Sequence, residues 1–314
     1  MNGAGFLIRR PGVMTLIQDS GRLGHHRLGL TTGGPADPLA FDWANRLCGN
    51  ESGAAALEMA VGGLELDAEV ATQVALCGAD MPMTINGSPV EGWRSHRVNP
   101  GDRLALGFAR SGVRAYLAVA GGFQLQKTLG SVSTVLREGL GGLAGRQLES
   151  GDRLPCPGAS EEACLMVPRG YRPVYSGRAL LRVVVGYQYE AFSEKARRQL
   201  FSAEYRVSAQ SDRMGYRLEG PPLQVALPVL LSEGICAGAV QVPPDGQPII
   251  LLCDRQTIGG YPKLGAVLSV DLGQLVQLPA GGRVTFAPID VAEARQIRLA
   301  ATRQFQALQP EVCS

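Results

Sequence analysis

The chain has 314 residues and a net charge of +2, and 45% of its residues are hydrophobic. A chain of this length can bury two sizeable cores, so two domains are expected. The basic residues are scattered, which excludes the clustered basic face typical of nucleic-acid-binding proteins. The opening MNGAGFLIRRPG has only Phe6, Leu7 and Ile8 as an apolar run, which matches neither a signal peptide nor a membrane span.

Glycine and proline dominate the turns of this sequence. The 41 glycines and 20 prolines follow no repeat, which is typical of many short strands joined by tight turns. We therefore expect a mainly β protein. Apolar and β-branched runs predict its clearest strands at 73–77, 115–120, 180–185, 249–252 and 267–270.

Helix signals are few. In DPLAFDWANRLCGN, residues 37–50, Asp37 stands at the N-cap and Pro38 at the first helical position, with apolar residues at helical spacing behind them. A second helix is predicted from Glu190 to Phe201, with Ser193 as an internal cap. A third is predicted from Asp290 to about Phe305.

Two segments, 99–109 and 279–289, each combine a glycine turn, an arginine and an alternating strand. This faint duplication favours two related β-barrel-like halves, with a junction near the proline-containing stretch from Pro155 to Pro173.

Cysteine and histidine usage argues against disulfide and metal frameworks. The cysteines are odd in number, lie far apart and include no C-x-x-C pair, so buried thiols in a reducing cytoplasm are expected. Only three histidines occur, and no metal site is predicted. The residues are Cys48, Cys77, Cys156, Cys164, Cys236, Cys253 and Cys313, and His25, His26 and His96.

The three lysines exclude two functions from this chain. None of Lys127, Lys195 and Lys263 lies between methionines as at a biotin attachment site, and none follows a phosphate-binding G-x-x-x-x-G loop. Any biotin or ATP chemistry would therefore need another polypeptide, and no cofactor is expected in this chain.

Polar side chains gather between residues 211 and 263. Here SDRMGYRLEG and SEGICAGAVQVPPDGQPIILLCDRQTIGGYPK alternate glycine and proline turns with short β-type runs. Turns of this kind hold polar tips at one rim of a rigid sheet. The stretch therefore predicts a site for a small polar molecule.

Several segments resemble one family. They are QDSGRLGHHRLGLTTGGPADPLAFDWANRLCGN, PGDRL, GGLAGRQLESGDRLP, SDRMGYRLEG, QVPPDGQPIIL and DRQTIGGYPK. Together they resemble the allophanate hydrolase subunit 2-like family, also called the biotin-dependent carboxyltransferase-like family. The resemblance runs through almost the whole chain in the expected order, and it implies two cyclophilin-like β-barrel domains with a few short helices, which we place at 1–165 and 166–314.

Family members serve in three settings. One is the C subunit of prokaryotic ATP-dependent 5-oxoprolinase, which cleaves 5-oxo-L-proline to L-glutamate. The others are the biotin-dependent carboxyltransferase part of urea carboxylase and a regulatory partner of a kinase inhibitor. With no biotin-carboxylase or biotinyl segment attached, the chain looks most like the 5-oxoprolinase component. The implied partners are a subunit 1-like protein, which is the B subunit of 5-oxoprolinase, and a lactam-utilisation protein, which is its A subunit, in a complex that uses ATP with magnesium.

Under this resemblance, residue chemistry assigns candidate roles. Arg213 or Arg22 can take a substrate carboxylate, and Gln241 or Gln256 can pair with an amide. Lys263 and Tyr261 are donors for a developing oxyanion, and Asp212, Glu233 or Asp254 can act as general base if desolvation raises the pKa. Backbone N–H groups near Gly33 and Gly34, or Gly259 and Gly260, are further candidate donors. Asp212 and Lys263 form the favoured catalytic pair.

Structural roles compete with these assignments. Asp212 and Arg213 can cap a turn or form an ion pair, and the segment from Gly259 to Pro262 can be a tight turn. Asp19 is expected to receive turn N–H groups, and Glu58 to be a buried hydrogen-bond acceptor or an inter-chain contact.

Overall fold

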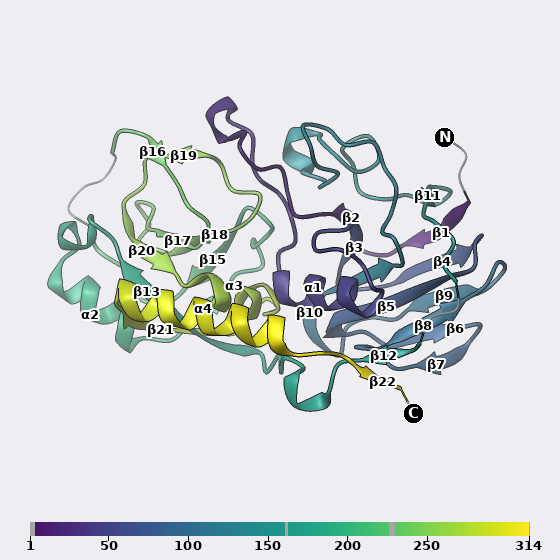
Figure 1. Cartoon of the computed structure of the whole chain (residues 1–314). Coiled ribbons are helices and arrows are strands. Elements are labelled where there is room, and N and C mark those ends of the chain that lie inside the picture. Colours follow the sequence, from purple (N-terminus) through teal and green to yellow (C-terminus); the bar gives the residue numbers. More distant parts are fainter. Residues whose placement is uncertain (1–3, 161–162, 226–229, 314) are drawn as a thin grey trace. The chain divides into compact units, whose positions relative to one another are not determined.

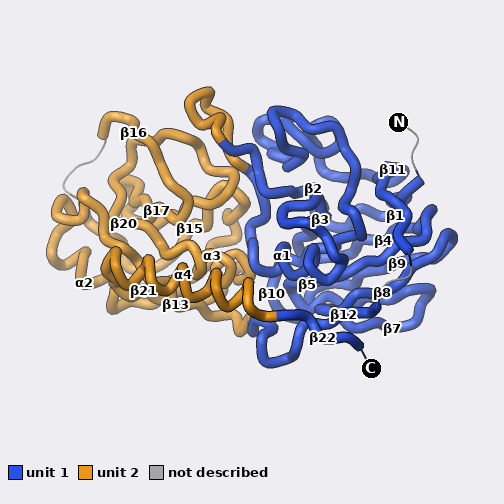
Figure 2. Tube along the Cα trace, in the orientation of Figure 1, with its two compact units in different colours: residues 1–23, 33–174, 309–314 blue, residues 24–32, 175–308 orange. Residues whose placement is uncertain are grey.

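A computed structural model describes residues 4–160, 163–225 and 230–313. The chain forms two compact units (Figure 2). Unit 1 contains the residues up to Leu23, Gly33–Val174 and the residues from Gln309, and unit 2 contains Gly24–Thr32 and Tyr175–Leu308. The changeover in mid-chain lies between Val174 and Tyr175. The division at residue 165 stays a prediction.

Unit 1 contains two antiparallel sheets (Figure 1). The six-stranded sheet has the order β11 (Arg153–Pro155), β1 (Gly5–Pro11), β4 (Leu64–Ala68), β9 (Arg103–Leu106), β6 (Met83–Ile85) and β7 (Ser88–Val90). The five-stranded sheet has the order β2 (Met14–Gln18), β3 (Ala56–Ala60), β10 (Ser111–Val119), β5 (Thr72–Asp80) and β8 (Ser95–Val98). A short pair joins β12 (Leu165–Met166) to β22 (Glu311–Val312).

One apolar core serves both sheets of unit 1. Phe6 and Leu66 of the larger sheet share a buried cluster with Leu76 and Leu117 of the smaller sheet. Alternation along the strands explains this, because every second side chain of a strand faces the same side.

Helix α1 (Pro38–Leu47) packs against β5 and β10 of unit 1. The Asp37 carboxylate accepts a hydrogen bond from the Ala40 N–H at 3.3 Å, so the predicted cap is confirmed. Trp43 is buried, and Phe41 meets the Tyr116 ring edge to face. The helix is therefore fixed by both its cap and its apolar face.

Unit 2 is built on a closed seven-stranded barrel in the described residues. Its order is β13 (Arg178–Val185), β20 (Lys263–Val267), β17 (Ala239–Gln241), β18 (Ile249–Leu251), β15 (Gly215–Glu219), β14 (Tyr205–Val207) and β21 (Arg283–Ile289). The parallel pairing of β13 with β21 closes it. A separate two-stranded sheet pairs β16 (Glu233–Gly234) with β19 (Ile258–Gly259).

The described residues of unit 2 include the α-helices α2 (Glu194–Ser202), α3 (Ser269–Val276) and α4 (Val291–Ala307). Ser193 caps α2 through a 3.1 Å bond from the Ala196 N–H, and Asp290 caps α4 through a 2.8 Å bond from the Glu293 N–H. Ala294 and Ile297 of α4 pack against Leu268 and Ile289. The predicted second helix starts later than expected, because residues 189–191 form a separate 3-10 turn before Ser193.

Two predictions need correction. The strand expected at 267–270 is wrong, since β20 ends at Val267 and α3 begins at Ser269. The expectation of buried thiols is also wrong for part of the set. Cys164 and Cys313 form a disulfide that ties β22 to the segment before β12, with their Cα atoms 5.3 Å apart, and Cys236 is exposed.

The mainly β class predicted from glycine and proline usage is confirmed. Among the described residues, no helix has both the length and the apolar character needed to cross a membrane.

Candidate active site in the barrel unit

Register places two candidate residues side by side in the barrel. Gln241 at the end of β17 lies opposite Lys263 at the start of β20, and directly paired residues of antiparallel strands present their side chains on the same face. The pairing shifts register between Val240 and Gln241. Such irregularities re-aim side chains near functional sites.

Glu233 is the centre of a polar cluster in unit 2. Its carboxylate accepts hydrogen bonds from the Lys263 ammonium and the Tyr187 hydroxyl, and from the Gln188 side-chain amide at 2.6 Å. The Gln188 side-chain Oε1 in turn accepts the Lys263 backbone N–H at 2.7 Å. We call these four residues the Glu233 cluster: Tyr187, Gln188, Glu233 and Lys263.

Burial within the cluster is uneven. The Lys263 side chain is 13% exposed and that of Glu233 is 34% exposed. The lysine therefore approaches the protein interior, whereas the carboxylate and the exposed Tyr187 ring reach solvent. A partly desolvated ammonium interacts more strongly with a nearby negative charge than one in bulk water.

Hydrogen bonding sets the charge state of Glu233. The bond from Lys263, followed by that from Tyr187, holds the pKa of Glu233 below its ordinary value of 4.5. The same contact with Glu233 raises the pKa of Tyr187. Glu233 is thus ionised at neutral pH and serves as a counter-ion. Burial acts to raise the pKa of Glu233, but these hydrogen bonds outweigh it, so the raised pKa expected of a general base is not found at Glu233.

This pairing gives a pH prediction. Because the folded pKa of Glu233 lies below the unfolded one, the stabilisation is present above about pH 4.5 and disappears as pH falls through the folded pKa. We expect Glu233→Gln to lower the free energy of unfolding by about 0.2–1 kcal/mol at pH 7, since the pair is partly exposed. The difference should shrink as the pH falls below 4.5 toward and through the folded pKa. Urea unfolding followed by circular dichroism at pH 7 and pH 3.5 measures it, and a difference that grows in acid would contradict it.

Gln241 is the most enclosed polar side chain here, at 1% exposure. Its side-chain nitrogen has no hydrogen-bond partner among the described residues. A Cβ added at Gly259 would come within 3.0 Å of that nitrogen and 2.5 Å of Ile235 Cδ1. A side chain at 259 would therefore displace the ends of Ile235 and Gln241, whereas glycine leaves the Gln241 amide in place as an unused donor.

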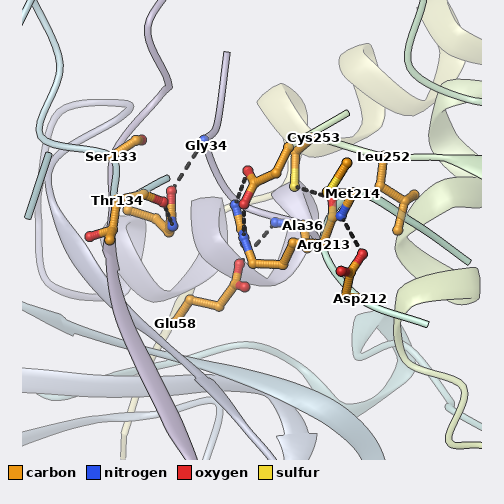
Figure 3. Close-up of polar contacts among 12 residues, drawn as sticks. Gly34, Ala36, Glu58, Ser133, Thr134, Asp212, Arg213, Met214, Leu252 and Cys253 are labelled. Atoms are coloured by element: carbon orange, nitrogen blue, oxygen red, sulfur yellow. Dashed lines mark hydrogen bonds and ion pairs between the residues drawn. The ribbon is translucent and has the colours of Figure 1, made fainter. Parts of the chain in front are cut away.

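Arg213, labelled in Figure 3, forms a buried ion pair with Asp254. Two guanidinium nitrogens donate to the two carboxylate oxygens at 2.9 and 3.0 Å, and the side chains are 6% and 7% exposed. The Asp254 N–H also donates to the Arg213 carbonyl at 3.0 Å. In the structure, Arg213 therefore binds a carboxylate of the protein, and Asp254 binds a guanidinium of the protein.

Asp212 organises the turn before β15. Its carboxylate accepts the Met214 N–H at 2.8 Å (Figure 3). It also accepts the Gly215 N–H at 3.3 Å. This is the turn-capping role that competed with catalysis in the sequence. The carboxylate that pairs with Lys263 is Glu233, so the favoured pair of Asp212 and Lys263 is not the one that the structure brings together.

The other predicted residues of unit 2 lie around these groups. Gly259 pairs with Glu233 across β16 and β19, and the Gly260 carbonyl accepts the Leu230 N–H at 2.9 Å. Tyr261 is exposed, and Gln256 is half-buried. They form the loop that leads into Lys263.

Arg22 and Gly34 have structural partners in unit 1. Arg22 is fully buried, and two of its nitrogens donate to the carbonyls of Thr128 at 3.0 Å and Ser133 at 3.2 Å. The Gly34 N–H donates to the Gln18 side chain at 3.1 Å. Arg22 therefore holds the 128–133 loop from inside unit 1 and is not presented to solvent.

Glu58 is a buried acceptor, as expected. It receives the Tyr116 hydroxyl at 2.7 Å and the Ala36 N–H at 2.9 Å. Within the described ranges, no group of three or more His, Cys, Asp or Glu side chains is placed to hold a metal ion.

The family model described as carboxyltransferase domain, subdomain A and B, matches residues 28–288. The chain belongs to this carboxyltransferase domain family. The resemblance predicted from its sequence motifs is thereby confirmed.

Relatives of this carboxyltransferase-domain chain include two kinds of enzyme. The C subunit of 5-oxoprolinase from Escherichia coli (strain K12) is 38% identical over 303 residues, which cover 96% of each protein. The urea amidolyase of Saccharomyces cerevisiae is 30% identical over 311 residues, which cover 93% of this chain and 17% of that protein. The crystal structure of the Kluyveromyces lactis urea carboxylase superposes with a TM-score of 0.89 at 29% identity, over 97% of this chain and 29% of that one.

Sequence reasoning missed two members of the Glu233 cluster in this carboxyltransferase domain. Tyr187 and Gln188 are uncharged and follow β13, about 45 residues before Glu233. Their only local signal is a polar Gly-Tyr-Gln turn directly after an apolar strand.

Proposed function

We propose that this protein is the C subunit of an ATP-dependent 5-oxoprolinase and that it handles the cyclic amide of 5-oxo-L-proline. The observation that carries the proposal is the extent of similarity to the 5-oxoprolinase C subunit of Escherichia coli, which covers 96% of both proteins. The fungal enzymes match this chain over less than a third of their own length.

The reaction breaks the ring C–N bond of the lactam. Water adds its hydroxyl to the carbonyl carbon and a proton goes to the nitrogen, giving L-glutamate. Negative charge develops on the carbonyl oxygen during attack, and preorganised donors at that oxygen lower the barrier. Lys263 is the donor that we assign to this charge, because its ammonium is partly desolvated and fixed by Glu233.

Glu233 is assigned a positioning role. Its ionised carboxylate and the Gln188 side chain hold both ends of Lys263, the ammonium and the backbone N–H. The unused Gln241 amide, opposite Lys263 in register, is suited to the lactam carbonyl or to the substrate carboxylate. Tyr261, Gln256, Gly259 and Gly260 supply the loop around these groups. In this scheme Arg213, Asp254 and Asp212 support the loops of the barrel, and Arg22 supports unit 1.

The proposed enzyme complex also contains partner proteins. Large apolar side chains are exposed on the segments that carry the Glu233 cluster: Leu231, Ile258 and Tyr261. Exposed apolar surface beside a polar site is typical of a protein-binding face. We assign this face to a subunit 1-like partner, and ATP with magnesium to a partner chain.

Reconstitution tests the proposed function. We expect this chain, mixed with its subunit 1-like and lactam-utilisation partners, ATP, magnesium and 5-oxo-L-proline, to release L-glutamate and ADP. Leaving this chain out should reduce glutamate release to background, because the lactam-handling donors would be missing. Full glutamate release without this chain would overturn the proposal.

A second function is supported by the likeness to the urea carboxylase structure. A biotin-dependent carboxyltransferase would use the same donors on urea or a related amide, with biotin carried by another polypeptide. The two functions separate in one assay, in which the chain is supplied with a carboxybiotinylated carrier and urea. Loss of carboxybiotin that depends on urea and on this chain would favour the second function.

A further inference from the structure

Unit 1 contains a cavity of about 440 Å³ that the proposed reaction does not use. Its lining lies entirely in unit 1: Asp19, Gly53, Ala54, Ala55, Phe123, Gln124, Leu125, Lys127, Val132 and Pro155. This volume falls within the range of about 300–1,000 Å³ found for small-molecule sites. The wall combines apolar side chains with one carboxylate and one ammonium.

Asp19 is the buried charge of this wall. Its Oδ1 accepts the Gly21 N–H at 2.9 Å and the hydroxyls of Ser131 and Ser133 at 2.6 Å each. Its Oδ2 accepts the Val132 N–H at 2.8 Å, the single hydrogen bond to this oxygen from the part of the chain that the structure describes. A carboxylate oxygen offers about two lone-pair sites, so Oδ2 has room for another donor.

All four of these partners are neutral. Among the described residues, no lysine, arginine or histidine nitrogen lies within salt-bridge distance of Asp19, whereas Glu58, Asp254 and Asp271 each have one. A buried carboxylate is ordinarily matched by a cation. Asp19 therefore contributes to the cavity wall a carboxylate that has no salt-bridge partner among the described side chains.

The charge state of Asp19 agrees with this geometry. Burial alone would raise the pKa of Asp19, but the hydrogen bonds from Ser131, Ser133, Val132 and Gly21 together outweigh burial and hold the pKa below its ordinary value of 3.8. The carboxylate is thus negative at neutral pH and attracts a cationic group.

The other residues that line the cavity indicate which further groups a ligand would carry. Phe123 and Val132 are buried and present apolar surface, and Leu125 and Pro155 extend it. Lys127 is exposed and supplies a positive charge to the same wall. A ligand with an ammonium, a carboxylate and a short apolar body would satisfy all three surfaces.

We propose that this cavity binds a small zwitterionic amino acid with an apolar side chain, with its ammonium on Asp19 Oδ2, its carboxylate on Lys127 and its side chain against Phe123 and Val132. The inference is independent of the proposed reaction, since Lys263 and Glu233 belong to unit 2.

Binding of three matched probes to the full chain tests the proposal. L-leucine carries both charges, 3-methylbutylamine lacks the carboxylate and 4-methylpentanoate lacks the ammonium. We expect calorimetry to show L-leucine binding at least about tenfold more tightly than either analogue, since each charge-assisted hydrogen bond is worth about one factor of ten or more. Absence of L-leucine binding would overturn the proposal.

Two variants locate the binding. Asp19→Asn is expected to weaken the binding of L-leucine at least about tenfold and to leave the affinity for 4-methylpentanoate unchanged. Lys127→Glu is expected to weaken the binding of L-leucine and to leave the affinity for 3-methylbutylamine unchanged. Lys195→Glu, an exposed lysine of α2 in unit 2, is the matched control and should change nothing. If Asp19→Asn fails to fold, Lys127→Glu decides. L-leucine affinity that survives Lys127→Glu would place the ligand elsewhere and overturn the assignment.

Discussion

Replacing Lys263 by methionine is expected to reduce the turnover of 5-oxo-L-proline by the reconstituted complex about 10²- to 10³-fold, the usual effect of removing one oxyanion donor. The ammonium is partly desolvated and held by the Glu233 carboxylate, so water cannot replace it without loss of orientation. Methionine keeps an unbranched side chain of similar size but removes both the charge and the N–H donors. Glutamate release at saturating substrate measures the effect.

Controls for Lys263→Met separate chemistry from assembly. Lys195→Met removes an exposed lysine from α2 and should leave turnover unchanged. Co-elution with the partner proteins in size-exclusion chromatography should persist in both variants. Wild-type turnover in Lys263→Met would remove Lys263 from the site, and loss of co-elution would make its role structural.

Replacing Asp254 by asparagine is expected to destabilise unit 2 by about 3–5 kcal/mol, the range for breaking a buried ion pair from one side. The substitution keeps the shape but removes the negative charge opposite the buried Arg213 guanidinium. Its effect should appear in urea unfolding followed by far-ultraviolet circular dichroism, and in faster hydrogen exchange of β15 and β18. Tryptophan fluorescence is unsuitable, because Trp43 and Trp93 both belong to unit 1.

The exposed pair of Arg198 and Glu194 in α2 is the control for Asp254→Asn. Arg198→Ala should cost no more than about 1 kcal/mol, since solvent screens the pair. If Asp254→Asn costs as little as Arg198→Ala, the ion pair is not a structural support of the barrel. Arg213 would then return to the set of substrate-binding candidates.

Local signals in the sequence were sufficient for the main helices and the fold class. The side chains that cap α1 and α4 accept hydrogen bonds from N–H groups only three residues further along the chain. Both partners of each cap can therefore be recognised within a few consecutive residues. Helix α3 was missed because Leu264 to Val270 reads as one apolar run. Periodicity cannot say where such a run changes from strand to helix.

The candidate site was predictable in its residue types but not in its pairings. Lys263 and Glu233 stood out as charges in a glycine-rich stretch, yet their contact spans 30 residues and depends on how β16, β19 and β20 are placed. Asp212 looked equally reactive, but its oxygens are used within its own turn. Tyr187 and Gln188 carry no charge, and only the tertiary structure brings them to Glu233.

The pairing of β13 with β21 sets the order in which the chain can fold during synthesis. These are the first and last strands of the barrel, about 105 residues apart in sequence, so unit 2 cannot close until nearly all of it has left the ribosome. Strand β22 then pairs with β12 of unit 1, which was made about 146 residues earlier. Such distant pairings slow folding, because loop closure precedes their stabilising contacts. Unit 1 acquires β22 only after the chain of unit 2 is complete, so the amino-terminal half of the protein is the first to be started and the last to be finished.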